Sequence, residues 1–314
     1  MSSLIEQAAE RLEQLRRAGV DVPQAASPGL SGISAESATP AATPVFEKVQ
    51  LPKEPAPSSR QVTLDLNAIL AAGIVTPNAP RSRAADQYRV IKRPLITNAM
   101  GKGATILKHG NLIMVTSALA GEGKSFTAIN LAMSIAAELD NTVMLIDADV
   151  ARPSVPRMLG LEAGAGLLDL LEGTADMASV LLKTNIDKLT ILPSGTPHPR
   201  ATELLASDAM RALLDDMAQR YSDRIIIFDS PPLLLKTEAR VLASQMGQIV
   251  MVVQADKTSQ ADVQHALSTI ENCPLRMLVL NKARGDSIGG YGHGYGYSRG
   301  YGYGYGTANE QQSA

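Results

Sequence analysis

Aromatic residues, cysteine and surplus charge are all scarce in this chain of 314 residues. There is no tryptophan and there are three phenylalanines, so the core has to be built from aliphatic side chains. The single cysteine, Cys273, excludes an internal disulfide and is typical of a reducing compartment. The formal net charge of -2 provides no general attraction to polyanions, so we expect no nucleic-acid partner.

Long apolar runs are missing as well. No stretch approaches the roughly 20 residues that a membrane-spanning helix needs. The first residues, Met1–Glu6, lack the basic and apolar regions of a signal peptide. We therefore expect a soluble, cytoplasmic protein.

The first 83 residues divide by composition into three segments. Residues 1–19 predict an amphipathic helix with a capping box at Ser3 and Glu6 and a stop at Gly19, either a docking element or a frayed tail helix. Residues 20–61 form a Pro/Ala-rich linker, because seven of the 18 prolines fall within 20–60. Residues 62–83 predict a segment that docks on the main domain or on a neighbour, because the sequence is apolar again from Val62 to Ile74.

Residues 84–285 alternate short apolar runs with helical patterns. The predicted strands are 112–116, 142–146, 189–192, 225–228, 249–253 and 277–280. The predicted helices include 125–139, 201–221, 239–245 and 260–272. Continuously apolar strands between helices indicate an α/β domain with a mostly parallel sheet covered on both faces.

The run ALAGEGKS, from Ala118 to Ser125, has the spacing of a Walker A loop and lies between a predicted strand and a predicted helix. Ala118 stands where the usual pattern has its first glycine. Glycines in the loop let backbone N–H groups converge on phosphate oxygens, Lys124 would reach the β- and γ-phosphates, and the Ser125 hydroxyl would bind Mg²⁺. The predicted ATP-binding residues are Ala120, Gly121, Glu122, Gly123, Lys124, Ser125 and Phe126. Asn281, after the last predicted strand, is a weaker candidate for contact with the adenine edge.

Carboxylates follow two further predicted strands. Asp147 and Asp149 end the run LIDAD, and Asp229 ends IIIFD in the manner of a Walker B motif, although such an aspartate can also cap a turn. Asp149 lies two residues past Asp147, and which of the two faces the phosphates stays open. The predicted metal ligands are Ser125, Asp147 and Asp229. Arg152 either reaches a phosphate or caps its own loop.

Six of the eight tyrosines lie in a glycine-rich run near the end, within residues 286–314: Tyr291, Tyr295, Tyr297, Tyr301, Tyr303 and Tyr305. Alternating glycine keeps such a backbone adaptable, and no apolar periodicity is present to bury the rings. Alone, the run is typical of a linker or an adhesive end. Behind a phosphate-binding loop, its hydroxyls are also candidate phosphate acceptors.

In this order, the motifs resemble those of the bacterial protein-tyrosine kinases. The resemblance is carried by AxxGxGKS, LIDADxxxP, IIIFDSPP and LPSGTP at 192–197, and it spans roughly residues 86–282. Residues 86–94 and the leading helix are similar to the branch tied to exopolysaccharide and exosortase loci. The resemblance implies Mg·ATP-dependent autophosphorylation of the tyrosine cluster in trans, in the service of exopolysaccharide biosynthesis. It assigns catalysis to Lys124, Asp147, Asp149 and Asp229.

The resemblance also implies partners. In this family an ExxRxxR helix docks on a neighbouring subunit and builds a ring; the matching residues here are Asp86, Arg89 and Lys92, for which an ordinary solvated helix face is the alternative. The family joins or pairs the kinase domain with a two-helix membrane adaptor of the chain-length-determinant type. This implies a separate adaptor that recruits the chain to the inner face of the plasma membrane, and a cognate tyrosine phosphatase.

Two other functions stay open. Partition and septum-site ATPases carry an extra lysine early in the loop, where this chain has Leu119. A switch ATPase of that kind would hydrolyse ATP when stimulated by a partner and would form no phosphotyrosine. A nucleotide-bound scaffold would bind ATP without turnover.

Overall fold

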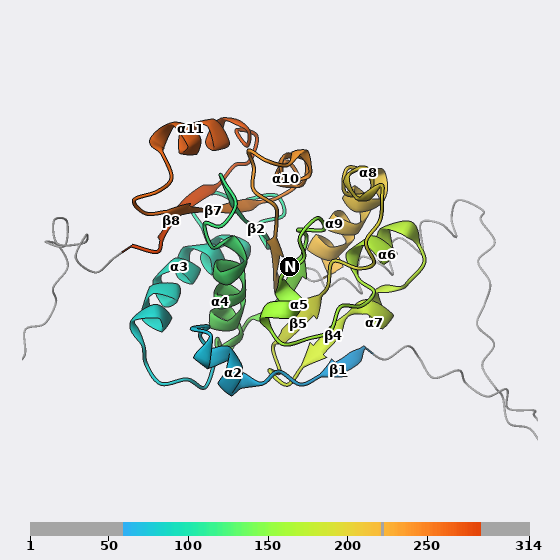
Figure 1. The fold of residues 1–314 in the computed structure, drawn as a ribbon, viewed down its shortest axis with the longest axis horizontal. Coiled ribbons are helices and arrows are strands. Elements are labelled where there is room, and N and C mark those ends of the chain that lie inside the picture. The colour runs from blue at the N-terminus through green and yellow to red at the C-terminus, as the bar shows by residue number, and fades with distance from the viewer. Residues whose placement is uncertain (1–58, 221–222, 284–314) are drawn as a thin grey trace, which may run out of the picture. The chain divides into compact units, whose positions relative to one another are not determined.

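The computed structural model describes residues 59–220 and 223–283, which form one sheet with helices on both faces (Figure 1). In these residues the sheet has eight strands in the order β1-β4-β5-β3-β6-β2-β7-β8. The strands are β1 (Arg60–Val62), β2 (Leu112–Ser117), β3 (Thr142–Asp147), β4 (Leu182–Thr184), β5 (Leu189–Leu192), β6 (Arg224–Asp229), β7 (Gln248–Gln254) and β8 (Arg276–Asn281). All neighbouring pairs are parallel except β4 with β5, so the prediction of a mostly parallel α/β sheet is confirmed.

Two apolar clusters form the core, one on each face of the sheet. In β2, Ile113 and Val115 pack into one cluster and Leu112 and Met114 into the other, because successive side chains of a strand point to opposite faces. All six residues of β2 are buried. A strand covered on both faces reads as a continuous apolar run, which is why it was predictable from the sequence.

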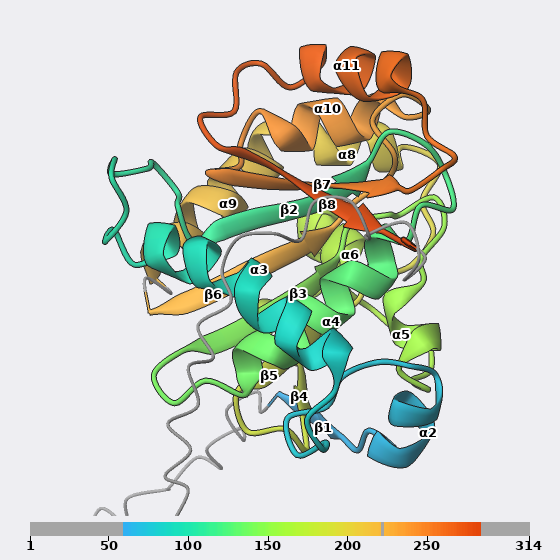
Figure 2. The same ribbon diagram turned by 90° about the vertical axis from the view of Figure 1, so that its left-hand side faces the viewer.

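The helices divide between these faces. The first cluster contains side chains of α2 (Leu66–Ala71), α3 (Arg83–Ala99), α4 (Lys124–Ala136) and α5 (Val155–Met158). The second contains side chains of α6 (Leu167–Glu172), α7 (Met177–Val180), α8 (Ala201–Leu205), α9 (Asp208–Arg220), α10 (Thr237–Ala243) and α11 (Gln260–Ser268). Figure 2 shows α3 lying over α4. This second layer explains why α4 is buried continuously from Thr127 to Ala136.

The sheet begins earlier in the chain than the predicted domain 84–285. Arg60 pairs with Leu182, and the Asn185 side chain donates to the Leu64 carbonyl and accepts from its N–H at 3.1 and 2.9 Å. Buried apolar side chains of the segment 62–83, including Ile69 and Ile74, join the core. A three-residue edge strand is too short to show a period, so its tertiary partners alone place it in the sheet.

The predicted helix 201–221 is two helices. α8 ends at Leu205 and α9 begins at Asp208. The Ser207 hydroxyl accepts from the Met210 N–H at 3.2 Å, as an N-cap side chain does. The helical spacing of apolar residues continues across this break, so the sequence pattern predicted one helix. The predicted helix within 1–19 and the tyrosine run lie outside the described residues.

Candidate active site

The loop between β2 and α4 depends on two glycines with positive φ. Gly121 has φ +84° and Gly123 has φ +99°, a region that side chains with a Cβ rarely adopt. A Cβ on Gly123 would lie 2.2 Å from Asn281 Nδ2. Gly123 therefore satisfies both a backbone and a packing requirement, and α4 begins directly after it at Lys124.

We expect Gly123→Ala to lose nucleotide binding by a factor of about 10 or more, because a clash and a strained φ together would displace the loop amides. Gly164→Ala is the matched control, since a Cβ at that position would meet no atom within 4 Å and the φ of Gly164 is not positive. Isothermal titration calorimetry with Mg·ATP measures the effect. Equal affinities for the two variants would contradict the role given to Gly123.

The Glu122 carboxylate is engaged by hydrogen bonds within the protein. The buried carboxylate accepts hydrogen bonds from the Leu119 N–H at 2.6 Å, from the Gln254 N–H at 3.2 Å and from the Thr258 hydroxyl. These contacts fasten the loop to the end of β7. Glu122 was predicted to bind nucleotide, and its side chain does not line the cavity described below.

Asn281, at the end of β8, supports the same loop from the other side. Its Nδ2 donates to the Glu122 carbonyl at 2.8 Å, and the neighbouring Lys282 Nζ donates to the Gly121 carbonyl at 2.6 Å. The side chain predicted to contact adenine thus holds the loop in this structure. Contact with a base stays a prediction.

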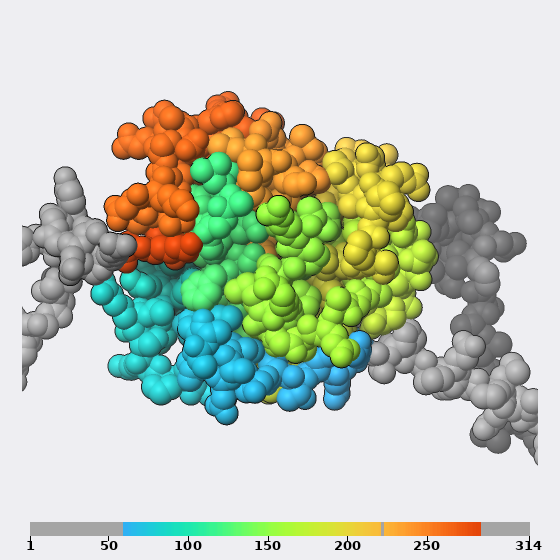
Figure 3. Space-filling model, in the orientation of Figure 1, coloured from blue at the N-terminus to red at the C-terminus, as the bar shows by residue number. Residues whose placement is uncertain are grey.

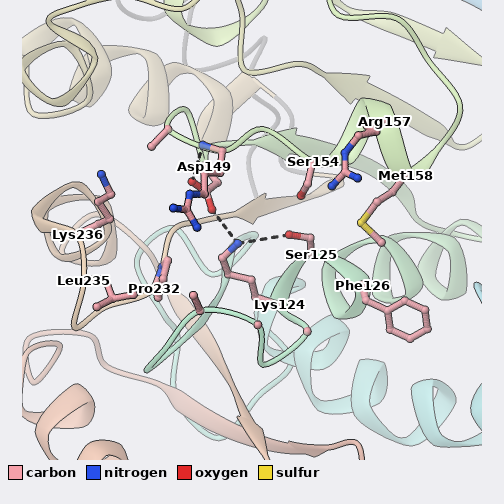
Figure 4. A pocket seen from close by; sticks show the side chains of 15 residues that line it. Lys124, Ser125, Phe126, Asp149, Ser154, Arg157, Met158, Pro232, Leu235 and Lys236 are labelled. Carbon is pink, nitrogen blue, oxygen red and sulfur yellow. Dashed lines mark hydrogen bonds and ion pairs between the residues drawn. The ribbon is translucent and has the colours of Figure 1, made fainter.

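Three carboxylates converge beside the loop at the carboxyl ends of β3 and β6. Asp147 and Asp229 are register partners on these two adjacent strands. Asp149 lies two residues beyond Asp147, and its Oδ2 pairs with Lys124 Nζ at 2.8 Å (Figure 4). Lys124 Nζ is also 3.5 Å from the Ser125 hydroxyl. The tertiary structure therefore brings the three predicted catalytic carboxylates to the same edge of the sheet as Lys124.

The two strand-end carboxylates have very different partners from Asp149. Asp147 Oδ2 accepts from the Ser154 and Val155 N–H groups at 2.9 Å each, and its Oδ1 is buried without a partner. Asp229 is fully buried, and neither of its oxygens makes a hydrogen bond of normal geometry within the described part of the chain, although the nearby Ser125 hydroxyl lowers its pKa. Unpartnered buried carboxylate oxygens are costly and call for a cation or a proton.

Burial sets the proton affinity of this pair. It raises the pKa of Asp229 to about 7, against the opposing charge of Lys124 and with a further increase from Asp147. Burial also raises the pKa of Asp147 to about 6, against the hydrogen bonds from Val155 and Ser154. Oxygen ligands with open lone pairs are what Mg²⁺ requires, so the residues present fit this ion. Such shifts are typical of functional sites.

A cavity of about 620 Å³ opens above the loop. Figure 3 shows this face, with the loop in green beside the lime-green residues that follow β3. It is lined by Ala120, Gly121, Gly123, Lys124, Ser125, Phe126, Asp149, Ala151, Arg152, Ser154, Arg157, Met158, Pro232, Leu235 and Lys236. Asp149 is therefore part of the cavity wall, whereas the fully buried Asp147 and Asp229 are not among its lining residues.

Comparison with known proteins gives this geometry a family. A family model matches residues 108–282: ParA, described as NUBPL iron-transfer P-loop NTPase. The tyrosine-protein kinase YwqD of Bacillus subtilis (strain 168) is 32% identical over 205 residues, which cover 65% of this chain and 83% of that protein. The chain belongs to the bacterial tyrosine-protein kinases.

Other members of the kinase family agree. Tyrosine-protein kinase CpsD of Streptococcus agalactiae is 32% identical over 189 residues, 59% of this chain and 80% of that protein. The crystal structure of the chimerical protein CapA2B2 superposes with a TM-score of 0.56 at 25% identity, covering 71% of this chain and 93% of that one. The P-loop NTPase fold is one that binds nucleotide and Mg²⁺ in general.

The kinase site also contains residues that motif reading missed. Arg157, Lys236 and Met158 line the cavity, beside the Arg152 already considered. Arg157 and Met158 belong to α5, a four-residue helix, and Lys236 is the N-cap of α10. No local motif marks them, because their position depends on how separate loops meet above the sheet.

The three predicted interface residues of the kinase do not share one exposed face of α3. Asp86 and Arg89 form an exposed ion pair with each other, whereas Lys92 is only 5% exposed and pairs with Glu138 Oε1 at 2.6 Å. A helix turns about 100° per residue, so six residues rotate Lys92 about 120° away from Asp86 and toward α4. A role in contact with another subunit stays a prediction, and Asp86 and Arg89 are the accessible members.

No helix in the described part of the kinase has the length and hydrophobicity to cross a membrane.

Proposed function

We propose that this protein is a Mg·ATP-dependent tyrosine autokinase that phosphorylates its own C-terminal tyrosine cluster. The observation that carries the proposal is the pairing of Lys124 with Asp149 in the lining of one cavity, next to two buried strand-end carboxylates, in a member of the tyrosine-kinase family. Phosphoryl transfer needs mainly positioning and neutralisation of charge, and this site contains groups suited to both.

Ser125, Asp147 and Asp229 are the residues that would hold Mg²⁺, which when bound neutralises charge on the β- and γ-phosphates. The amides of the loop and the N-terminus of α4 would bind phosphate oxygens. Lys124 would exchange its partner Asp149 for the phosphates. The cavity side chains Arg152, Arg157 and Lys236 add positive charge where the transferred group passes.

Asp149 is the better placed of the two candidate bases. It lines the cavity, whereas Asp147 is committed to two backbone N–H groups. Once Lys124 binds the phosphates, the Asp149 carboxylate is free to accept a proton. The phenol oxygen then attacks the γ-phosphorus, the bond from that phosphorus to the leaving oxygen of ADP breaks, and the phenol proton passes to Asp149.

The proposed acceptors are the six tail tyrosines from Tyr291 to Tyr305, presented to a neighbouring subunit of a ring. Each phosphate adds about -1.5 to -2 charges, so several within 15 residues would repel one another and weaken assembly. We further propose a membrane adaptor of the chain-length-determinant type, a cognate tyrosine phosphatase and a role in exopolysaccharide export. The family membership supports these partners.

Mixing two complementary variants tests transfer between subunits. One carries Lys124→Met with an intact tail, and the other has an intact site with all six tail tyrosines changed to phenylalanine. We expect phosphotyrosine on the first chain in the mixture and on neither chain alone, as mapped by mass spectrometry. Tyr88 is buried, so we expect no phosphate on it. Phosphorylation at Tyr88 instead of the tail would contradict the assignment.

A partition-type switch ATPase is the second candidate, and the match to the ParA family model is the observation in its favour. Leu119 occupies the position of the extra lysine of that group. Such an ATPase, or a scaffold without turnover, would give no phosphotyrosine in the mixing experiment. The tyrosine-kinase relatives favour the first function.

A further inference from the structure

Within residues 59–220 and 223–283, the outer strand β8 pairs with another strand on one side only. On its other side the Ile249 N–H donates to the Leu275 carbonyl, and the Ala255 N–H donates to the Asn281 carbonyl. Peptide groups alternate in direction along a strand, so odd-numbered residues of β8 face β7. The N–H and C=O groups of Leu278 and Leu280 therefore point to the free edge.

The same edge exposes apolar side chains. Leu278 is 54% and Leu280 is 65% exposed, and Val90 of α3 is 74% exposed. All three line a groove of about 390 Å³ between α3 and β8, together with Tyr88 and Ile91. Proteins normally cover or blunt a strand edge of this kind, because it pairs readily with other extended chain.

The residues that follow β8 have the pattern of a matching strand. Every odd position from Tyr291 to Tyr305 carries tyrosine, histidine or arginine, and every even position from Gly290 to Gly306 carries glycine, except Ser298. A strict period of two places all rings on one face of an extended chain. Glycine on the other face permits a close approach to a neighbouring backbone.

We propose that the segment Tyr291–Tyr297 docks in its own chain as an antiparallel strand on the free edge of β8, with its rings against the groove. β8 ends at Asn281, and residues 282–290 are long enough for the return, since antiparallel neighbours need only a short connection. Added strands of this kind gain their affinity from main-chain hydrogen bonds and their specificity from alternate side chains. A second copy would have to supply the same strand by association, whereas in its own chain only residues 282–290 separate this segment from Asn281, which lines the groove.

An effect of this docking on activity rests on the proposed function. If the tail tyrosines are the phosphate acceptors, docking withholds them from a catalytic site and slows autophosphorylation. Docking itself requires neither nucleotide nor catalysis, and it is therefore tested without them.

Residue-resolved amide hydrogen exchange on the full chain, without nucleotide, tests the docking. We expect the Leu278 and Leu280 amides to exchange about 10-fold or more faster in the variant Tyr291→Ser, Tyr295→Ser, Tyr297→Ser than in the unmodified chain. The Met277 and Val279 amides face β7 and should stay equally slow in both, which reports that the sheet is intact. The matched control changes Tyr301, Tyr303 and Tyr305 to serine and should keep the protection.

Three results would overturn the proposal. Rapid exchange of Leu278 and Leu280 in the unmodified chain would show a free edge. Protection that survives in the first serine variant would assign the edge to another occupant. Protection that disappears on dilution would assign it to a second copy.

Discussion

Lys124→Met is expected to reduce phosphotyrosine formation by about 100-fold or more, the usual cost of removing a preorganised group that stabilises transition-state charge. Lys124 Nζ is 2.8 Å from Asp149 Oδ2 and belongs to the phosphate-binding loop itself, whereas the other cations of the cavity, Arg152, Arg157 and Lys236, come from separate loops and helices. Incubation with Mg·ATP followed by anti-phosphotyrosine detection measures the loss.

Lys183→Met is the matched control for this substitution. Lys183 is an exposed residue of β4, on the opposite half of the sheet from the loop, and should retain full activity. Thermal unfolding of both variants separates loss of catalysis from loss of fold. Phosphotyrosine that persists in a folded Lys124→Met protein would remove the loop from the proposed mechanism.

Asp229→Asn is expected to stabilise the protein without Mg·ATP and to abolish the stabilisation that Mg·ATP brings. Because burial raises the pKa of Asp229 from 3.8 to about 7, the folded state binds this proton more tightly than the unfolded state. The free energy of unfolding therefore falls as pH rises from about 4 to about 7. A shift of this size corresponds to a loss on the order of 4 kcal/mol at most.

Urea unfolding between pH 4 and pH 8 measures both effects. In Asp229→Asn the free energy of unfolding should fall less steeply as pH rises, because only Asp147 still contributes to the fall. The pKa of Asp147 is raised to about 6, so its contribution is lost between about pH 4 and pH 6. In the unmodified protein, saturating Mg·ATP should add roughly 3 kcal/mol at 100-fold excess over its dissociation constant, and in the variant much less. If Asp229→Asn is less stable than the unmodified protein at pH 8 without Mg·ATP, the Asp229 carboxylate is stabilised by groups of the protein and does not need a bound cation.

Much of the sheet was predictable because its central strands are covered on both faces. β2, β3 and β6 are continuous apolar runs, and each begins or ends within one residue of its predicted bounds. The elements that sequence reading missed are short: β1, β4 and the helices α5, α6 and α7. Three to six residues show no clear period, and such elements owe their conformation to packing.

Spacing in the sequence determined the chemistry of the site. A strand, a glycine-rich turn and a helix in succession specify a phosphate-binding loop, and a carboxylate after each of two parallel strands comes to the same edge of the sheet. Local rules of backbone geometry are enough for these inferences. They named Lys124, Ser125, Asp147, Asp149 and Asp229 without knowledge of any contact between them.

The tertiary structure alone decided which groups face the cavity and which are already engaged. It turned Asp149 toward Lys124, buried Asp147 and Asp229 beneath them, and directed Glu122 into hydrogen bonds with β7. It also rotated Lys92 into an ion pair with Glu138 and, in the described part of the chain, left β8 with a strand partner on one side only. These outcomes depend on contacts between residues far apart in the chain, and the direction of a side chain follows from its neighbours in space.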